Sequence, residues 1–96
     1  MFPMLSTENL EQALRFYGEL LGGTETYRFP EGGPPVFVVL KLGESDIGLG
    51  AMTGAPPLHG QPLRPARGHR IELCVYVDDV DATIARMRAG GVSILL

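Results

Sequence analysis

Lysine, cysteine and long apolar segments are scarce in this 96-residue sequence. Lys41 is the one lysine, and 8 Lys and Arg residues stand against 11 Asp and Glu, for a formal net charge of −3. A nucleic-acid-binding surface is therefore not expected, because phosphate binding needs clustered cations. With Cys74 as the single cysteine, no internal disulfide can form, and a reducing, cytoplasmic location is expected. No apolar run approaches the roughly 20 residues of a membrane span, so no membrane partner is expected.

Apolar periodicity divides the first half of the chain into one helix among strands. The length fits one domain, or two very small modules that share a core. Asn9 is suited to an N-cap and Gly22-Gly23 to a helix stop, and between them leucines recur at three- and four-residue steps. We therefore expect residues 1–52 to form a first βαβββ module. Its predicted elements are a strand at 2–7, a helix at 10–21, and strands at 24–29, 36–42 and 47–51.

The second half opens with a segment typical of a linker. Residues 53–68 hold three glycines and four prolines. Residues 70–77 then alternate between aliphatic and other side chains, which predicts a strand. Asp78-Asp79 is suited to cap a helix that ends at Gly90-Gly91, and another strand is predicted after it. Residues 69–96 are thus expected to form a partial second module of βαβ order.

The two halves repeat each other. Val80 and Ile84 stand 70 residues after Leu10 and Leu14, in corresponding helices. The second copy lacks the last two strands of the first, so its sheet would keep an edge of unpaired backbone donors and acceptors. We expect another chain to close that edge, as in a homodimer with or without strand exchange; otherwise the natural chain continues past Leu96.

Two motifs resemble those of the vicinal oxygen chelate superfamily, which includes glyoxalase I, bleomycin resistance protein and extradiol dioxygenases. Residues 9–22 are similar to its first helix, with the pair Phe16-Tyr17 and a Leu-Gly end, and residues 77–82 are similar to its Val-Asp-Asp-Val-Asp entry into the second helix. The resemblance implies an α+β fold in which tandem βαβββ modules form a curved, cup-shaped sheet, here with the second module truncated after βαβ. One face of that sheet packs on the helices, and the other lines a ligand cavity.

The resemblance also implies where a metal ion would bind. Metal-using members place His, Gln or Glu ligands on their first, fourth, fifth and eighth strands. In this chain those positions fall on Phe2, on Gly48 or Gly50, on Glu72, and beyond the last residue. Phenylalanine and glycine offer no side-chain donor, so we expect no metal site and no cofactor. The chain is then most similar to metal-free, bleomycin-resistance-like members.

Strand alternation selects a set of candidate ligand-binding residues. In the segment 70–77 the aliphatic side chains are expected to face the helices and the mixed side chains to face the cavity. Glu72 is either a ligand contact or an ion-pair partner of Arg70. Gly48 and Gly50 either leave room for a bulky or planar ligand or permit strong curvature of the sheet. The candidate residues are Phe2, Met4, Phe37, Gly48, Gly50, Met52, Glu72, Cys74 and Tyr76.

Catalytic residues are not identified from the sequence. It contains no Ser/His/Asp set and no Gly-rich phosphate loop. His59 lies in the predicted linker, and His69 stands three residues before Glu72, on the opposite face of a strand, so neither is expected to bind a metal.

Three functions are compatible with these features. The favoured one is a metal-independent protein that binds and sequesters a small, partly apolar or aromatic molecule, as in antibiotic resistance. An alternative is a lyase or dioxygenase of the same superfamily that uses a divalent metal, with ligands completed by missing strands or a partner chain. A further alternative is an interaction module that pairs through its open sheet edge.

Overall fold

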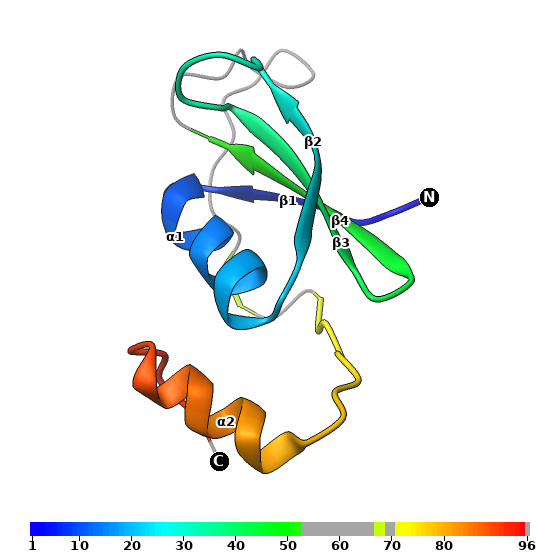
Figure 1. Cartoon of the computed structure of the whole chain (residues 1–96). Helices are drawn as coiled ribbons and strands as arrows, with labels where there is room; N and C mark the ends of the chain where they lie inside the picture. The colour runs from blue at the N-terminus through cyan, green and yellow to red at the C-terminus, as the bar shows by residue number, and fades with distance from the viewer. Residues whose placement is uncertain (53–66, 69–70, 96) are drawn as a thin grey trace. The chain divides into compact units, whose positions relative to one another are not determined.

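The computed structural model describes residues 1–52, 67–68 and 71–95. The chain divides into two compact units, Met1–Pro65 and Ala66–Leu96, and each is described by itself. The elements, labelled in Figure 1, are β1 (Met4–Thr7), α1 (Leu10–Leu14), η1 (Arg15–Leu20), β2 (Thr24–Phe29), β3 (Phe37–Leu42), β4 (Ser45–Ala51) and α2 (Val80–Ala89).

The first unit is an open, curved four-stranded sheet with the strand order β1-β4-β3-β2. The three strands β2, β3 and β4 form an antiparallel meander, and β4 returns to pair in parallel with β1. In that parallel pair Met4 lies opposite Gly48 and Ser6 lies opposite Gly50. The predicted βαβββ order of this half is therefore confirmed, with α1 and η1 between the first two strands.

The core lies between the sheet and its helix. Its buried residues come from α1, β3 and β4, and Leu5 and Tyr17 pack against them. Alternate residues of each strand face this side, as the strand period requires. Burying each aliphatic side chain contributes roughly 1.5–3 kcal/mol. The buried cluster consists of Leu10, Val38, Leu40, Ile47 and Leu49.

The first helix has the predicted extent but not a uniform geometry. Asn9 caps it, because its side-chain oxygen accepts a hydrogen bond from the Gln12 amide at 3.0 Å. The second half, η1, is a π-helix in which the Leu21 amide donates to the Phe16 carbonyl oxygen at 3.0 Å. The apolar repeat predicts the buried stripe of such a helix but not the width of its turns. Burial of Tyr17 in this segment raises the pKa of its hydroxyl above the ordinary value of 10.0.

The second unit contains α2, whose position was predicted. Asp79 is its N-cap and accepts a hydrogen bond from the Ala82 amide at 2.9 Å. Of the predicted apolar stripe, Met87 is buried, Ile84 is half-buried and Val80 is exposed. Beyond the helix, Gly91 has a φ of 87°, a conformation suited to glycine at a helix end.

The strands predicted on either side of α2 are wrong for the described residues. Residues 71–77 and 92–95 carry no strand. A strand needs a hydrogen-bonded neighbour as well as an alternating sequence. Neither segment finds such a ladder partner among the described residues, so alternation alone does not make them strands. Of the predicted linker, only Arg67 and Gly68 are among the described residues. His59 and His69 lie outside the described residues, so the expectations for them stay predictions.

Among the described helices, none is long and apolar enough to cross a membrane.

Gly23 is predicted to be essential for the turn from η1 into β2. A Cβ at this position would lie 2.7 Å from the Tyr17 carbonyl oxygen and 3.2 Å from Leu42 Cδ2. The oxygen belongs to the backbone, and it accepts a hydrogen bond from the Gly23 amide, so it cannot swing away. We expect Gly23→Ala to reduce the free energy of unfolding by roughly 1–3 kcal/mol in urea denaturation.

The matched control is Gly32→Ala. A Cβ at Gly32 would meet nothing within 4 Å, so the stability should change by no more than about 0.5 kcal/mol. Equal stability of the two variants would contradict the close approach at Gly23.

Candidate ligand-binding site

The sheet has a second face, opposite the helix, which we call the aromatic face. Residues paired across neighbouring strands lie on the same face of a sheet. The register therefore groups side chains of all four strands, together with Phe2, which precedes β1 and approaches Gly48. The aromatic face consists of Phe2, Met4, Ser6, Tyr27, Phe29, Phe37, Val39, Gly48 and Gly50.

Large apolar side chains on this face are open to solvent. Phe2 is 44% exposed, Met4 51%, Tyr27 52% and Phe29 57%. The helix side of the same sheet instead buries its aliphatic side chains almost completely. An exposed apolar group of this kind is typical of a surface that binds a ligand or a partner.

The glycines of β4 form the floor of the aromatic face. A Cβ at Gly48 would lie 3.0 Å from Met4 Sδ, 3.0 Å from Phe2 Cε2 and 3.3 Å from Phe37 Cε2. A Cβ at Gly50 would lie 2.6 Å from Met4 Cε. The space above the glycines is thus occupied by side chains of this chain, and a ligand could reach the glycine backbone only where these side chains move aside. Because glycine has no side chain, Phe2, Met4 and Phe37 can lie close to the backbone of Gly48 and Gly50.

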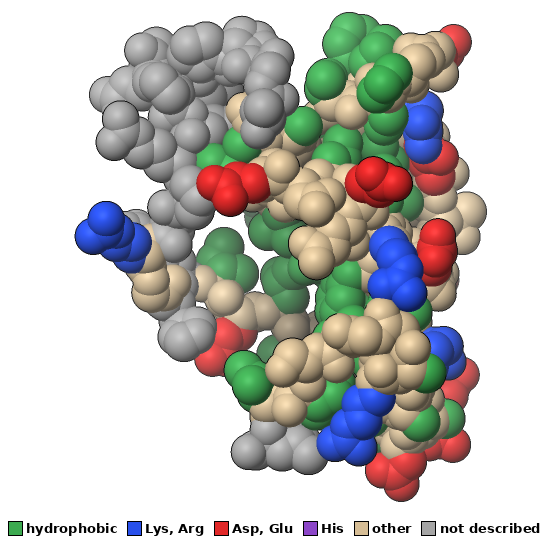
Figure 2. Space-filling view, turned by 90° about the vertical axis from the view of Figure 1, so that its left-hand side faces the viewer, with side chains coloured by type: hydrophobic (Ala, Val, Ile, Leu, Met, Phe, Trp, Pro, Cys, Tyr) green, Lys and Arg blue, Asp and Glu red, His purple; other side chains and the backbone are tan. Residues whose placement is uncertain are grey.

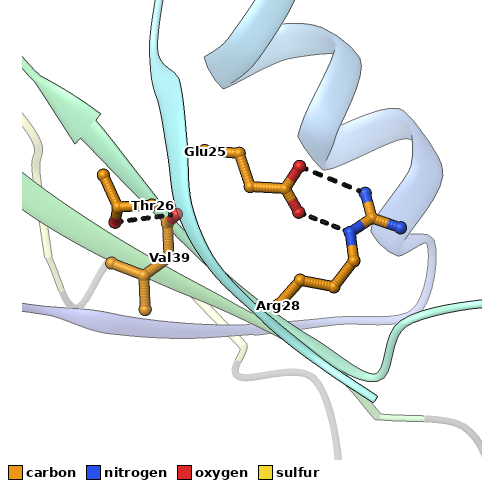
Figure 3. Close-up of polar contacts among 4 residues, drawn as sticks. All are labelled: Glu25, Thr26, Arg28 and Val39. Atoms are coloured by element: carbon orange, nitrogen blue, oxygen red, sulfur yellow. Dashed lines mark hydrogen bonds and ion pairs between the residues drawn. The ribbon is translucent and has the colours of Figure 1, made fainter. Parts of the chain in front are cut away.

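A β-bulge in β2 decides which of its side chains reach the aromatic face. Glu25 pairs with Leu40 and Tyr27 with Val39, so the extra residue is Thr26, whose hydroxyl donates to the Val39 carbonyl oxygen at 3.4 Å. Figure 3 shows this contact beside the bulged strand. Past the bulge, Tyr27 and Phe29 lie on the aromatic face, although neither was among the sequence candidates. Two aromatic residues at a two-residue spacing were the signal that could have found them.

Tyr27 also joins a sequence candidate directly. Its ring centroid lies 5.9 Å from that of Phe37, with the ring planes at 60°. Edge-to-face pairs of this kind are favourable and fix the orientation of both rings. The rings of Tyr27 and Phe37 therefore have fixed orientations where the aromatic face crosses β2 and β3.

The same bulge sends two charged side chains to the helix side of the sheet. Glu25 and Arg28 form a two-pronged ion pair there, with Arg28 Nη2 3.4 Å from Glu25 Oε2 and a second contact from Nε (Figure 3). Both side chains are more than a third exposed, so the pair contributes at most about 1 kcal/mol. The pair borders an open hollow of about 340 Å³ lined by Leu14, Gly18, Glu19, Gly23, Glu25, Arg28 and Leu40.

The view of the molecule in Figure 2 shows acidic and basic side chains interspersed among the described residues. One such contact joins Arg15 Nε and Glu19 Oε2, 3.9 Å apart along η1. Mixed charges of this kind are typical of a solvated surface and do not form a focused field.

The structure brings together five of the nine sequence candidates: Phe2, Met4, Phe37, Gly48 and Gly50. Met52 follows β4, is half-buried, and donates its amide to the Thr7 carbonyl oxygen at 2.8 Å. Glu72, Cys74 and Tyr76 are exposed residues of the second unit, and Cys74 is a free thiol. Their place in a ligand site stays a prediction.

The aromatic face does not fit a metal ion. Phe2 and Gly48 are neighbours, as expected if they occupy the superfamily's first- and fourth-strand ligand positions. Neither side chain has a donor atom. Within the ranges that the structure describes, no three His, Cys, Asp or Glu side chains gather as a metal site would require.

The first unit is thus a βαβββ module with its helix on one face of the sheet and an open apolar face on the other. The sequence model of the Glyoxalase/Bleomycin resistance protein/Dioxygenase superfamily matches residues 3–96, and the chain belongs to this superfamily. No match was found among curated proteins.

Solved structures share the fold at low sequence identity. TioX from Micromonospora sp. ML1 is 24% identical with a TM-score of 0.66, over 94% of this chain and 71% of TioX. The bleomycin resistance determinant encoded on transposon Tn5 is 19% identical with a TM-score of 0.58, over 99% of this chain and 67% of that one.

A metal-bound protein also shares the fold. A variant of the fosfomycin resistance protein FosX from Listeria monocytogenes, complexed with Mn(II) and 1S,2S-dihydroxypropylphosphonic acid, is 16% identical with a TM-score of 0.65. The match covers 97% of this chain and 67% of FosX. The fold therefore occurs with a bound metal, and its presence alone does not decide how this chain works.

Proposed function

We propose that this chain binds and sequesters a small, partly apolar or aromatic molecule on its aromatic face, without a metal ion. The observation that carries the proposal is the gathering of exposed Phe2, Met4, Tyr27 and Phe29 around a glycine floor. Sequestration requires only a complementary surface, whereas coordination chemistry would require donor atoms that Phe2 and Gly48 lack.

The biological setting that fits this proposal is resistance to a toxic small molecule. Two of the structural neighbours are resistance proteins, against bleomycin and fosfomycin. The free, exposed thiol of Cys74 supports a reducing, cytoplasmic location. In this proposal Met52 extends the site, and Glu72, Cys74 and Tyr76 supply its more polar part from the second module.

Ligand binding is predicted to stabilise the folded chain. A ligand at about 100 times its Kd adds roughly 2.7 kcal/mol to the free energy of unfolding, which raises the Tm of a domain of this size by roughly 11–22 °C. Thermal-shift measurements should find such a rise with bleomycin-type or planar aromatic compounds. Phe29→Ala should at least halve the shift, because it removes a side chain of the aromatic face. The variant itself should still fold, because Phe29 is 57% exposed and its loss costs the fold little.

Val80→Ala is the matched control. It also removes an exposed apolar side chain, but on α2, so it should leave the shift unchanged. If no compound of either type stabilises the wild-type chain, the sequestration proposal fails.

The competing function is a metal-dependent lyase or dioxygenase, with Glu72 as one ligand and the others from a partner chain. Against this, the purified protein is predicted to contain no stoichiometric metal and to bind Zn²⁺, Mn²⁺, Fe²⁺ and Ni²⁺ only weakly in calorimetric titrations. Gly48→Glu is the matched control: one added carboxylate beside Phe2 still leaves fewer than the three donors that a metal site needs, so this variant should also bind no stoichiometric zinc. Tight one-to-one binding by the wild-type chain would favour the enzyme.

Self-association is the remaining part of the proposal. The segment 71–77 has a strand-like sequence but no ladder, and its aliphatic residues Ile71, Leu73 and Val75 are exposed. In the described sheet β1 is an edge strand that pairs only with β4. We infer that two copies associate, and that the segment 71–77 of one copy adds to the β1 edge of the other.

Sedimentation equilibrium at micromolar concentrations is predicted to show a dimer. Val75→Pro should raise the dissociation constant at least about tenfold, because proline removes a ladder donor and is excluded from paired strands. Val75→Ala keeps the amide and should weaken the dimer less. A monomeric wild-type chain would rule out this pairing.

A further inference from the structure

Among the described residues, Met4 is the one side chain that covers both glycines of the aromatic face. Its sulfur would lie 3.0 Å from a Cβ at Gly48, and its methyl carbon 2.6 Å from a Cβ at Gly50. Gly48 is also approached by Phe2 and Phe37. At Gly50 the next nearest atoms are backbone oxygens of Leu5 and Val36, at 3.9 Å. The methyl group of Met4 is therefore the cover of the Gly50 backbone.

Met4 is also free to leave this position. It is 51% exposed, lies on an edge strand, and is outside the buried cluster of the core. An unbranched thioether side chain has three rotatable bonds and adapts to different neighbours at little cost. The backbone floor beneath it is held by the β1–β4 and β3–β4 ladders, so it would stay in place when Met4 moves.

We propose that Met4 is a displaceable plug and the specificity-determining residue of the aromatic face. A planar ring enters by displacing the Met4 methyl group and then lies flat on the Gly48–Gly50 backbone, beside Phe2 and Phe37. The proposal rests on the proposed function and adds the ligand's chemistry to it. Flat fused aromatic rings fit a floor without Cβ atoms, whereas thick saturated rings stand too far from the backbone to stack.

The need to displace Met4 raises the apparent Kd of the ligand by a measurable factor. When a site is open only part of the time, the apparent Kd is the intrinsic Kd divided by the open fraction. Removing the plug therefore tightens binding without adding a contact. If the wild-type site is open roughly 10–30% of the time, Met4→Ala should bind a planar probe about 3- to 10-fold more tightly.

Acridine, a flat and fluorescent three-ring compound, is the probe for fluorescence titration of the wild-type chain, Met4→Ala and Met4→Ala/Gly50→Ala. Met4→Ala is expected to bind acridine more tightly than the wild type. The added Gly50→Ala should cancel this gain, because its methyl group raises the floor on which the ring rests. Val80→Ala, an exposed truncation on α2, should bind as the wild type does.

A methyl NMR spectrum gives a second readout. The Met4 methyl resonance, identified by its absence in Met4→Ala, should shift on addition of acridine to the wild-type chain. A resonance that stays in place while acridine binds would show that the ring does not displace Met4, and would overturn the plug.

The titration separates the failure of the plug from the failure of the proposed function. Acridine affinity that is equal in the wild type and Met4→Ala, or a gain that survives Gly50→Ala, overturns the plug alone. Failure of both chains to bind acridine, while other compounds stabilise the wild type, also overturns the plug alone. If no compound of any class binds either chain, both proposals are overturned.

Discussion

The parallel pairing of β1 with β4 is the constraint on which the rest of the first unit depends. It joins the start of the chain to its fourth strand and sets Met4 opposite Gly48 and Ser6 opposite Gly50. The same register turns Leu5 and Leu49 toward the helix, so one set of backbone hydrogen bonds determines both the core and the aromatic face. A slip of one residue would exchange the two faces of β1 and place Met4 in the core.

The first unit could be predicted well because its signals are local. Leucine spacing, the Asn9 cap and the glycine stop specify the helix, and turn residues separate the strands. The bulge in β2 could not be predicted, because it depends on which residues of β3 lie opposite Glu25 and Tyr27. This one extra residue moves Tyr27 and Phe29 to the aromatic face and brings Glu25 beside Arg28. The sequence candidates therefore included Phe37 but missed its ring partner.

In the second unit the helix could be predicted from local signals, but the strands could not. The helix α2 was predicted correctly because its cap and its hydrogen bonds are supplied within a few residues. The segment 71–77 has a stronger alternating pattern than most strands of the first unit, yet it forms none. Alternation specifies which side chains would share a face, but the ladder has to come from another strand. Glu72, Cys74 and Tyr76 are thus candidates whose common face exists only where such a partner pairs with them.

Glycine at position 48 of β4 determines what can lie against the backbone of the sheet at this point. A metal ligand at this position needs a side chain of several atoms to carry its donor away from the backbone. Such a side chain at Gly48 would meet Phe2, Met4 and Phe37, whose nearest atoms lie 3.0–3.3 Å from where its Cβ would be. Glycine instead lets aromatic and thioether groups lie against the peptide plane itself. At Gly48 the fold therefore places aromatic and thioether groups against the backbone, at a point where a side chain long enough to carry a metal donor would have to displace them.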